Sequence, residues 1–451
     1  MRIGIPLLQE EINGRCGWIA GLHYVKSCLN ALATLNTPLI EEVIVFIPSD
    51  FSERLLSSDF DKEVSWLTQV KVPEQSPEET RKLMDTYHCD FFFPQVSIPT
   101  IDYPSKCIGW VPDFQYKYLP ECYSQEGIDF ADYISVFLAT YCSKMICISH
   151  DVKNDYNQFF PEFNNAVAVQ FRVSFSSDEL DNDPNTVREK YNLPKKFIYF
   201  SAQFWKHKNH KLVFEAWKEL IEQGCDYTLV CSGAPRDNRD PDYFPKLEAM
   251  MKKNNLTKNI RILGFIDRTE QIQLFRCASA VLQASLFEGW STTIEEATAL
   301  GKPLIVSDLD IHHEQCENRA FYFSKNDPQN LATLLKQKWG ELPDGFDLQH
   351  ETKAREQYAN LIKTFAQELM ALFQSVIEDT QQPNKLLQQL ILQNMQLKAK
   401  EEVISNLTKV CKEREALILK PGPQLAQSKN LARKKLASLF SKIKRRLAQM
   451  R

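Results

Sequence analysis

The chain has 451 residues, of which 43% are apolar and 25% charged, the composition of an ordinary globular protein with room for two or three domains. Its formal charge of −4 conceals an asymmetry, because residues 424–451 carry nine basic side chains and no acidic one. The twelve cysteines form no CxxC pair, which argues against a zinc site or a disulfide framework and favours reduced thiols in a cytoplasm. We expect neither a signal peptide nor a membrane-spanning helix, because the first residues lack a basic stretch before a long apolar core and no apolar run reaches about 18–20 residues.

Residues 1–185 alternate short β-rich runs with helical patterns, which predicts a parallel sheet covered by helices on both faces. Ligands bind beyond the carboxyl ends of strands in such sheets. After the first run comes a glycine-containing loop with Gly17 and Gly21, where missing Cβ atoms let the backbone approach a ligand or simply make turns. Asp113, after the run KCIGWVP, binds a sugar or caps the next segment. His150, after KMICIS, is a weaker candidate because a lone histidine is more often structural.

A polar stretch, DELDNDPNTVREKYNLP, marks a domain boundary before the alternation of strands and helices restarts over residues 186–345. The first run of this second lobe leads into the loop FWKHKNH. A lysine such as Lys208, placed at a helix start beyond a strand, neutralises a diphosphate. The alternative reading is a solvated basic loop.

A second chemistry-bearing stretch, LFEGWSTTIEEATALG, follows the strand-like run SAVLQAS. Glu288 lies in the loop, and Thr292 and Thr293 stand where a helix begins, so backbone N–H groups there are available to an anion. Glu296 lies about one turn into the helix, so it and Glu288 flank one cleft and are suited to hydroxyl groups of a ribose and a sugar. Glu295 points to another helix face. The alternative is that these acids only stabilise the helix dipole.

Together these features resemble the second lobe of GT-B retaining glycosyltransferases of family 4, most clearly over residues 196–306. The first half matches more weakly, through its glycine-containing loop and GWVPDFQYKYLPECYS, and resembles a bacterial subset of that family. The motifs that carry the resemblance are the spaced pair Glu288 and Glu296, the dipeptide Lys208–Asn209, Ser232 and Gly233 in VCSG, and Gly264 in IRILGFI.

The resemblance implies an α/β fold of two Rossmann-like lobes with a cleft between them and a helical C-terminal tail. It implies that Glu296 binds the nucleotide ribose, Glu288 contacts the donor sugar and Lys208 stabilises the leaving diphosphate. In relatives the first glycine loop faces the diphosphate or acceptor. The backbone that would hold phosphate or sugar belongs to Gly289, Trp290, Ser291, Thr292, Thr293 and Ile294.

One position departs from the family pattern. Many relatives carry an arginine five residues before the lysine, whereas this chain has Gln203. The diphosphate site would therefore carry one positive charge fewer unless Lys206 compensates, and a lysine does not replace the bidentate geometry of an arginine.

The expected activity is transfer of a hexose from a nucleotide-diphosphate sugar, GDP-mannose or a UDP-hexose, to a hydroxyl group of a glycan or lipid-linked glycan, with retention at the anomeric carbon. No prosthetic group is expected, and no metal, because no DxD pair follows a strand of the first lobe. Two alternatives stay open. One is an inactive scaffold or membrane-docked binding protein on this fold, and the other is a sugar-nucleotide epimerase, which would need acid–base groups around the sugar.

The C-terminal quarter reads as helical. Residues 346–380 are expected to pack back on the lobes, and 381–420 to form a long helix or coiled coil that supports self-association through 385–419. Residues 421–451 form a basic amphipathic segment. Its cations, at 424–451, would bind an anionic membrane surface rather than nucleic acid. The expected location is therefore the cytoplasm, peripheral to the inner face of the membrane, which liposome flotation with and without residues 424–451 would test.

Overall fold

The computed structural model describes residues 1–7, 19–49, 55–56, 64–72, 82, 85–96 and 106–379. The chain divides into two compact units, residues 1–384 and 385–451. The predicted coiled coil and basic amphipathic segment lie outside the described residues. Among the described helices, none is both long and apolar enough to cross a membrane.

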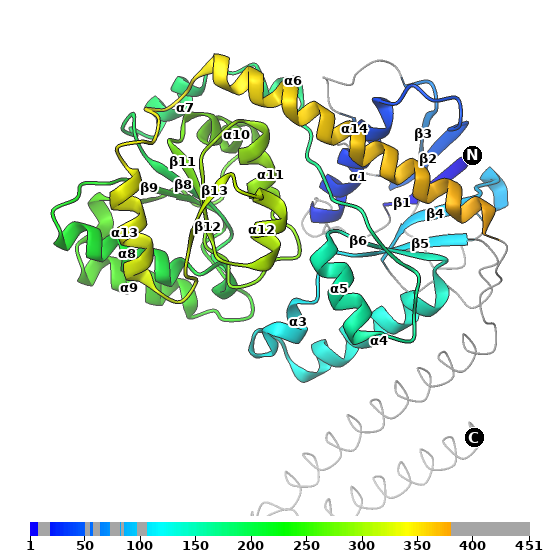
Figure 1. Cartoon of the computed structure of the whole chain (residues 1–451), viewed down its shortest axis with the longest axis horizontal. Helices are drawn as coiled ribbons and strands as arrows, with labels where there is room; N and C mark the ends of the chain where they lie inside the picture. The colour runs from blue at the N-terminus through cyan, green and yellow to red at the C-terminus, as the bar shows by residue number, and fades with distance from the viewer. Residues whose placement is uncertain are drawn as a thin grey trace, which may run out of the picture. The chain divides into compact units, whose positions relative to one another are not determined.

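The first lobe is built on a seven-stranded sheet in the order β3-β2-β1-β4-β5-β6-β7, and all its strand pairs are parallel (Figure 1). Its strands are β1 (Arg2–Pro6), β2 (Glu42–Pro48), β3 (Leu67–Val72), β4 (Phe91–Gln95), β5 (Lys106–Val111), β6 (Lys144–Cys147) and β7 (Ala166–Ala168). Its helices are α1 (Ile19–Ala33), α3 (Gln115–Tyr118), η2 (Pro120–Cys122), α4 (Gln125–Tyr141) and α5 (His150–Phe159).

The second lobe has a six-stranded parallel sheet in the order β10-β9-β8-β11-β12-β13. Its strands are β8 (Ile198–Ser201), β9 (Leu229–Ser232), β10 (Ile260–Ile262), β11 (Ala280–Gln283), β12 (Leu304–Ser307) and β13 (Ala320–Phe323). Its longer helices are α8 (His210–Glu222), α9 (Tyr243–Lys253), α10 (Arg268–Cys277), α11 (Thr292–Ala299) and α13 (Pro328–Lys338). The shorter ones are α6 (Ser177–Leu180), α7 (Pro184–Lys190), η3 (Lys206–Lys208), η4 (Leu256–Lys258) and α12 (Asp310–Cys316).

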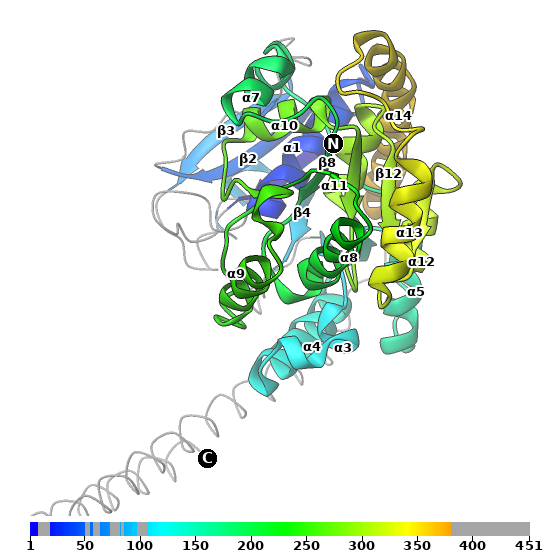
Figure 2. The same ribbon diagram turned by 90° about the vertical axis from the view of Figure 1, so that its left-hand side faces the viewer.

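Both strand orders reverse direction beside the first strand of the lobe, which is the doubly wound arrangement. The central strands β8, β9, β11 and β12 are buried along their whole length, as expected for parallel strands covered by helices on both faces. α8 and α13 lie side by side as part of this cover (Figures 1 and 2). The predicted α/β class with two parallel-sheet lobes is confirmed.

Local sequence signals explain where individual helices begin and end. The side chain of Ser149 caps α5 by accepting a hydrogen bond from Val152 N, and Asp327 caps α13 just before Pro328. Gly301 follows α11 with a φ of +66°, the left-handed conformation that commonly ends helices.

The long helix α14 (Leu348–Glu378) joins the two lobes, as Figure 1 shows. Near its start it packs against α11 of the second lobe, and further along it packs against α1 of the first. There Phe373 lies between Phe91 and Phe93, with ring centroids 5.1 and 5.2 Å away. The hydroxyl of Tyr358, in the middle of α14, accepts a hydrogen bond from Val173 N of the connection that follows β7 (3.0 Å).

Candidate active site

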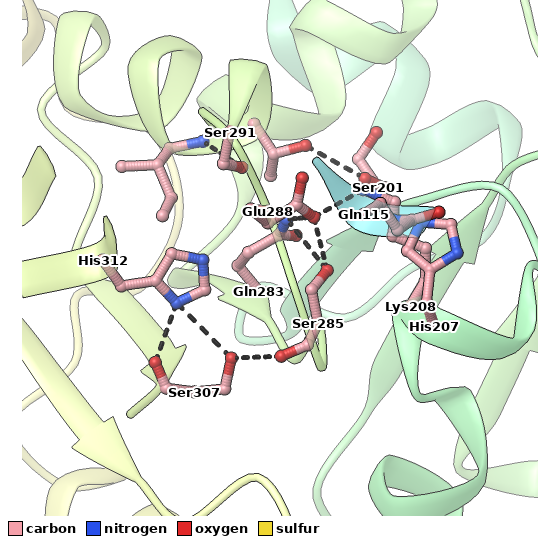
Figure 3. Close-up of polar contacts among 12 residues, drawn as sticks. Gln115, Ser201, His207, Lys208, Gln283, Ser285, Glu288, Ser291, Ser307 and His312 are labelled. Carbon is pink, nitrogen blue, oxygen red and sulfur yellow. Dashed lines mark hydrogen bonds and ion pairs between the residues drawn. The ribbon is translucent and has the colours of Figure 1, made fainter. Parts of the chain in front are cut away.

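The carboxyl ends of the second sheet bring polar side chains together. β8 ends at Ser201, β9 at Ser232, β11 at Gln283 and β12 at Ser307. Because the strands are parallel, these ends share one edge of the sheet, the edge at which doubly wound folds bind ligands. Figure 3 shows several of these residues around Glu288.

Lys208 and Glu288 form an ion pair at this edge, with Lys208 Nζ 2.5 Å from Glu288 Oε1. The same oxygen accepts hydrogen bonds from Ser285 Oγ (2.5 Å) and Gln283 Nε2 (2.9 Å). Both side chains are largely buried, with 17% of Lys208 and 11% of Glu288 exposed. Thus the structure brings together two residues that lie 80 positions apart in the chain.

The surroundings keep Glu288 charged. Burial by itself would raise the pKa of Glu288, but Lys208 and the Ser285 hydroxyl outweigh burial, so the pKa lies below its ordinary value. The two loops are also joined by a backbone hydrogen bond from Leu286 N to His207 O (2.8 Å). The pair is therefore a preformed charged centre on an apolar sheet.

Two buried acceptor atoms near this centre have no hydrogen-bond partner among the described residues, His312 Nε2 and Gln283 Oε1. His312 Nδ1 lies 2.7 Å from the carbonyl oxygen of Ser307, so the Nδ1 proton is donated there and Nε2 is an acceptor. Burial lowers the pKa of His312 to about 4, which keeps the ring neutral. In Figure 3 Glu288 lies between His312 and Lys208. These atoms suit a ligand that brings hydroxyl donors.

The first lobe reaches the centre at Asp113, which follows β5. Desolvation raises the pKa of Asp113, and the charges of Glu288, Lys208 and Arg239 are close enough to act on it. Asp113 Oδ1 also accepts a hydrogen bond from Gln115 N (2.8 Å), the capping role that the sequence left open. Both readings of Asp113 therefore remain compatible with its position.

The backbone of Gly289 packs tightly against the first lobe. A Cβ atom there would lie 2.0 Å from the carbonyl oxygen of Pro112 and 2.7 Å from Asp113 Cβ. Its own carbonyl oxygen accepts a hydrogen bond from Ser149 Oγ (3.0 Å), also from the first lobe. Only glycine permits this contact.

The first turn of α11 lies beside the charged centre. Ser291 caps the helix by accepting a hydrogen bond from Ile294 N (3.3 Å), and Thr293 Oγ1 donates to Ser201 O (3.1 Å) at the end of β8. Thr292 is exposed. The first amides of a helix have no partner within it, so this turn presents donors to an anion.

Glu296 is buried on α11 and paired with Arg268 at the start of α10. Arg268 Nη1 lies 2.5 Å from Glu296 Oε1, so the two side chains form an ion pair. The angles between these atoms do not meet those of a hydrogen bond. Arg268 Nε donates to Glu179 Oε1 (2.8 Å). Burial raises the pKa of Glu296, and Arg268 opposes this effect. Arg268 was not predicted, since nothing in the sequence places it opposite the second glutamate.

Glu295 has a different role from its two neighbours in the motif. Its side chain is 2% exposed, and its Oε1 accepts hydrogen bonds from Arg172 Nη1 (2.9 Å) and Gln315 Nε2 (2.8 Å). Its Oε2 accepts one from the Tyr358 hydroxyl of α14. Arg172 also lies over the ring of the buried Trp290, 5.3 Å from its centroid. Glu295 thus ties α11 to the connections between the lobes.

Two predicted glycines shape the strand ends next to this site. Gly233 has a φ of +142°, a Cβ there would lie 2.1 Å from Ala202 O, and its N–H donates to Gly264 O (2.8 Å). Gly264 has a φ of +73°. Ser232 Oγ is 2.6 Å from the hydroxyl of the buried Tyr199. All three predicted residues therefore lie at the carboxyl ends of β9 and β10, where they shape the backbone.

Gln203 and Asn209 both position loops. Gln203 Oε1 accepts a hydrogen bond from Ala234 N (2.7 Å), across to the loop after β9. Asn209 has a φ of +63°, and its Nδ2 donates to Lys325 O (3.0 Å). Asparagine is among the residues that tolerate this left-handed conformation, which turns the chain from η3 into α8.

The remaining candidates lie in the first lobe. Gly21 is a buried residue within α1 rather than in the preceding loop, and Gly17 lies outside the described residues. His150 is exposed at the start of α5, where its backbone N–H donates to Glu314 Oε1 of the second lobe (2.8 Å). Glu314 Oε2 accepts from Asp151 N (2.9 Å), so a carboxylate occupies this helix start.

Arg239 is a further cation at the boundary of the lobes that the sequence did not reveal. It lies on the loop between β9 and α9, and its Nη1 donates to Gln115 Oε1 of the first lobe (3.2 Å). Its Nη2 lies 3.2 Å from His207 Nδ1, next to Lys208. The loop sequence SGAPRDNRDP contains two arginines and no periodic pattern, so it offered no signal that would select one of them.

Comparison with known proteins agrees with this arrangement. Residues 183–339 match the family model of glycosyl transferases group 1. The match spans nearly the whole of the second lobe, hereafter the group 1 lobe. This group 1 lobe contains Lys208, Glu288 and Glu296, together with the loop that carries Arg239.

Curated relatives match about half of this chain at low identity. The chain is 24% identical over 221 residues to the O-antigen chain mannosyltransferase RfbU of Salmonella typhimurium, covering 49% of this chain and 57% of the relative. It is 25% identical over 230 residues to the serotype-specific mannosyltransferase WbdA of Escherichia coli, covering 48% and 28%. The chain thus spans little more than half of the first relative and less of the second.

Solved structures share the fold of both lobes. HepE of Anabaena, solved with UDP and glucose, matches with a TM-score of 0.57 at 16% identity, covering 83% of this chain and 100% of that one. Sucrose-phosphate synthase of Thermosynechococcus elongatus matches with a TM-score of 0.58 at 13% identity, covering 84% and 99%. At such identities the likeness concerns the fold.

Proposed function

We propose that the chain transfers a hexose from a nucleotide-diphosphate sugar to a hydroxyl group, with retention at the anomeric carbon. The observation that carries the proposal is the ion pair of Lys208 and Glu288, 2.5 Å apart beside the first turn of α11 and facing Asp113 of the other lobe. A cation, helix amides and a carboxylate then surround the place where the sugar–phosphate bond would lie.

In this reaction the acceptor oxygen forms a bond to the anomeric carbon as the bond from that carbon to the phosphate oxygen breaks. The electron pair leaves with the diphosphate, and the acceptor proton passes to the released phosphate oxygen. Lys208 and the first-turn amides of α11 would stabilise the charge that develops on the leaving group. Glu288, whose Oε1 is held by three donors, would position the sugar rather than take up the proton.

The acceptor atoms around the centre suit a hydroxyl-rich ligand. His312 Nε2 and Gln283 Oε1, buried and without partners among the described residues, would accept hydrogen bonds from sugar hydroxyls. Glu296, one turn further along α11 and paired with Arg268, would accept hydrogen bonds from the ribose.

The comparisons support both donor classes that the sequence resemblance implies, GDP-mannose and a UDP-hexose. Its curated relatives include mannosyltransferases, which favours GDP-mannose, and HepE was solved with UDP-glucose, which favours a UDP-hexose. The names of the first two relatives, an O-antigen enzyme and a serotype-specific enzyme, favour a surface glycan or its lipid-linked precursor as the acceptor. The basic segment at 424–451 would then bring the enzyme to an anionic membrane surface.

Thermal-shift measurements with GDP, UDP, ADP and dTDP test the donor site. A diphosphate present at 100 times its Kd stabilises the fold by about 2.7 kcal/mol, so one nucleotide should raise the melting temperature clearly above the others. Glu296→Ala should weaken binding of that nucleotide about 10-fold to 100-fold, as expected for a lost hydrogen bond to a charged group.

Release of the nucleoside diphosphate from the matching sugar nucleotide then tests transfer. Binding without acceptor-dependent release would identify the chain as a binding scaffold, and interconversion of the sugar without release would indicate an epimerase. No shift with any nucleotide would disprove the donor site.

A methyl group at Gly289 should impair the reaction by holding the lobes apart. Gly289→Ala places a Cβ 2.0 Å from the backbone carbonyl oxygen of Pro112, which no side-chain rotation can move away. A displacement of about 1 Å near the reacting atoms costs roughly 100-fold in turnover. Gly340→Ala, at a glycine with no neighbouring atom within 4 Å of the added carbon, is the matched control. Equal turnover in the two variants would contradict the prediction.

A further inference from the structure

Arg239 is a candidate for the second cation of the diphosphate site, which the sequence does not provide at position 203. Where many relatives have an arginine, this chain has Gln203, which is uncharged and holds Ala234 N of the loop after β9 (2.7 Å). We propose that Arg239, on that same loop, binds a phosphoryl group of the ligand and supplies the second positive charge beside Lys208. The proposal rests on the proposed function, since it concerns the same site.

The position of Arg239 next to Lys208 is defined by its contacts. Its Nη2 lies 3.2 Å from His207 Nδ1, and His207 directly precedes Lys208. A guanidinium only donates, so His207 Nδ1 accepts and the neutral ring carries its proton on Nε2. This agrees with the pKa of His207, which burial and the neighbouring cation Lys208 lower to about 3. The charges of Arg239 and Lys208 therefore both act on His207.

The loop that carries Arg239 is held firmly. Asp237, with its side chain 2% exposed, accepts hydrogen bonds from Lys206 N and from Arg239 N, each at 3.0 Å. Together with the bond from Ala234 N to Gln203, these contacts join the loops after β8 and β9 into one unit. Gln203 therefore holds the loop that carries Arg239, and Arg239 provides the positive charge.

Arg239 keeps capacity to bind a ligand. Of its five N–H donors, three have partners among the described residues, His207, Asp237 and Gln115. Arg239 also donates a hydrogen bond to the Tyr123 hydroxyl, which leaves at least one N–H without a partner among the described residues and open to an anion. The guanidinium lies over the rings of Trp205 and Tyr123, 5.4 and 5.5 Å from their centroids, and 31% of its side chain is exposed. Contact with two aromatic rings restricts the orientation of the planar guanidinium, which suits binding of a phosphoryl group.

The local charges show why a second cation is required. Lys208 is already paired with Glu288, and Asp113 lies close to both. A diphosphate would therefore meet a centre with no net positive charge if Lys208 acted alone. Lys206, the compensating residue suggested by the sequence, and Arg239 are both exposed residues, but it is the charge of Arg239 that acts with that of Lys208 on Asp113 and His207.

The phosphoryl group has two chemical sources. One is the diphosphate of the sugar nucleotide, and the other is a phosphate on the acceptor, because Gln115 and Tyr123 bring the first lobe to Arg239. Calorimetric titration of the full chain distinguishes them. The probes are the nucleoside diphosphate that stabilises the protein, its monophosphate and free nucleoside, and glucose 6-phosphate with inorganic phosphate.

The variants are Arg239→Gln, Arg239→Lys and Arg236→Gln. Arg236 is an exposed arginine on the same loop and serves as the control. For the donor source, Arg239→Gln should weaken the diphosphate about 10-fold to 100-fold while nucleoside binding stays constant, because a charged hydrogen bond to the phosphate is lost. Arg239→Lys should recover part of the loss, and Arg236→Gln should bind as the natural chain does.

If the phosphate comes from the acceptor, Arg239→Gln should weaken the binding of glucose 6-phosphate or inorganic phosphate and leave the binding of the diphosphate unchanged. An equal loss for diphosphate and nucleoside would show a structural effect and overturn the proposal, as would unchanged binding of every phosphate. If the natural chain binds no nucleoside diphosphate, the proposed function fails. The Arg239 proposal is then decided by the sugar-phosphate and inorganic-phosphate titrations.

Discussion

Lys208→Ala is expected to reduce turnover about 100-fold to 1,000-fold, the range found when one group that stabilises developing charge is removed. Lys208 Nζ is 2.5 Å from Glu288 Oε1, so the variant removes the cation and also leaves a buried carboxylate unpaired. Burial would then raise the pKa of Glu288, because the largest opposing influence is lost. The lost cation and the unpaired carboxylate both destabilise the leaving diphosphate, whereas protonation of Glu288 would relieve part of the second effect.

The experiment compares kcat and KM from nucleoside diphosphate release. Lys208→Arg keeps the positive charge and should retain more activity than Lys208→Ala. The double variant Lys208→Met with Glu288→Gln removes both charges and so separates the lost cation from the unpaired carboxylate. Melting temperatures establish that each variant is folded. Turnover of Lys208→Ala within two-fold of the natural chain would remove Lys208 from the proposed mechanism.

Glu295→Ala is expected to lower the free energy of unfolding by about 3–5 kcal/mol, the cost of breaking a buried ion pair by removing one partner. The side chain of Glu295 is 2% exposed and that of Arg172 is 13% exposed, so solvent screens this pair little. The variant also removes the acceptor of Gln315 and of the Tyr358 hydroxyl. Arg172 would remain as a charge between the lobes without its carboxylate.

Denaturant unfolding followed by circular dichroism measures this effect. Glu222→Ala is the matched control, because Glu222 pairs with Lys218 one turn away on α8 and has 60% of its side chain exposed. Such exposed pairs contribute about 0.3–0.5 kcal/mol. If Glu295→Ala cost no more than Glu222→Ala, the buried network would not be what joins α11 to the connections between the lobes.

The strands that the sequence predicted are mostly those in the middle of the sheets. Central strands such as β8 and β11 are buried on both faces and therefore read as continuous apolar runs. The strands β3, β7 and β13 were not predicted, and all three stand at sheet edges. β3 has one buried residue among partly or fully exposed ones, and β7 has three residues, so neither shows the apolar run of a central strand.

Site residues could be predicted from the sequence only where they directly follow a predicted strand. Lys208 and Glu288 each follow a strand of one predicted sheet, so the rule on strand ends placed them together, and the structure brings them into contact. Arg239 and Arg268 were not predicted, because their significance depends on which carboxylate or histidine lies opposite. Spacing along a loop carries no such information.

Glu295 illustrates the same limit within a motif. Its spacing on α11 excluded it from the ligand side, but its partners Arg172 and Tyr358 are 123 and 63 residues away. Contacts at such separations are decided by how the second lobe folds back along α14. They cannot be obtained from helical periodicity.

The segment after β7 and the helix α14 both connect the lobes, and they meet at Tyr358. Its hydroxyl accepts a hydrogen bond from Val173 N (3.0 Å) and donates one to Glu295. Phe373, between Phe91 and Phe93, fixes the far end of α14 to the first lobe. Two linkers joined at one point keep the lobes from separating. The translational and much of the rotational entropy of bringing Asp113 to Glu288 is therefore lost during folding rather than during binding. More of the interaction energy with a ligand then remains for the step that breaks its bond.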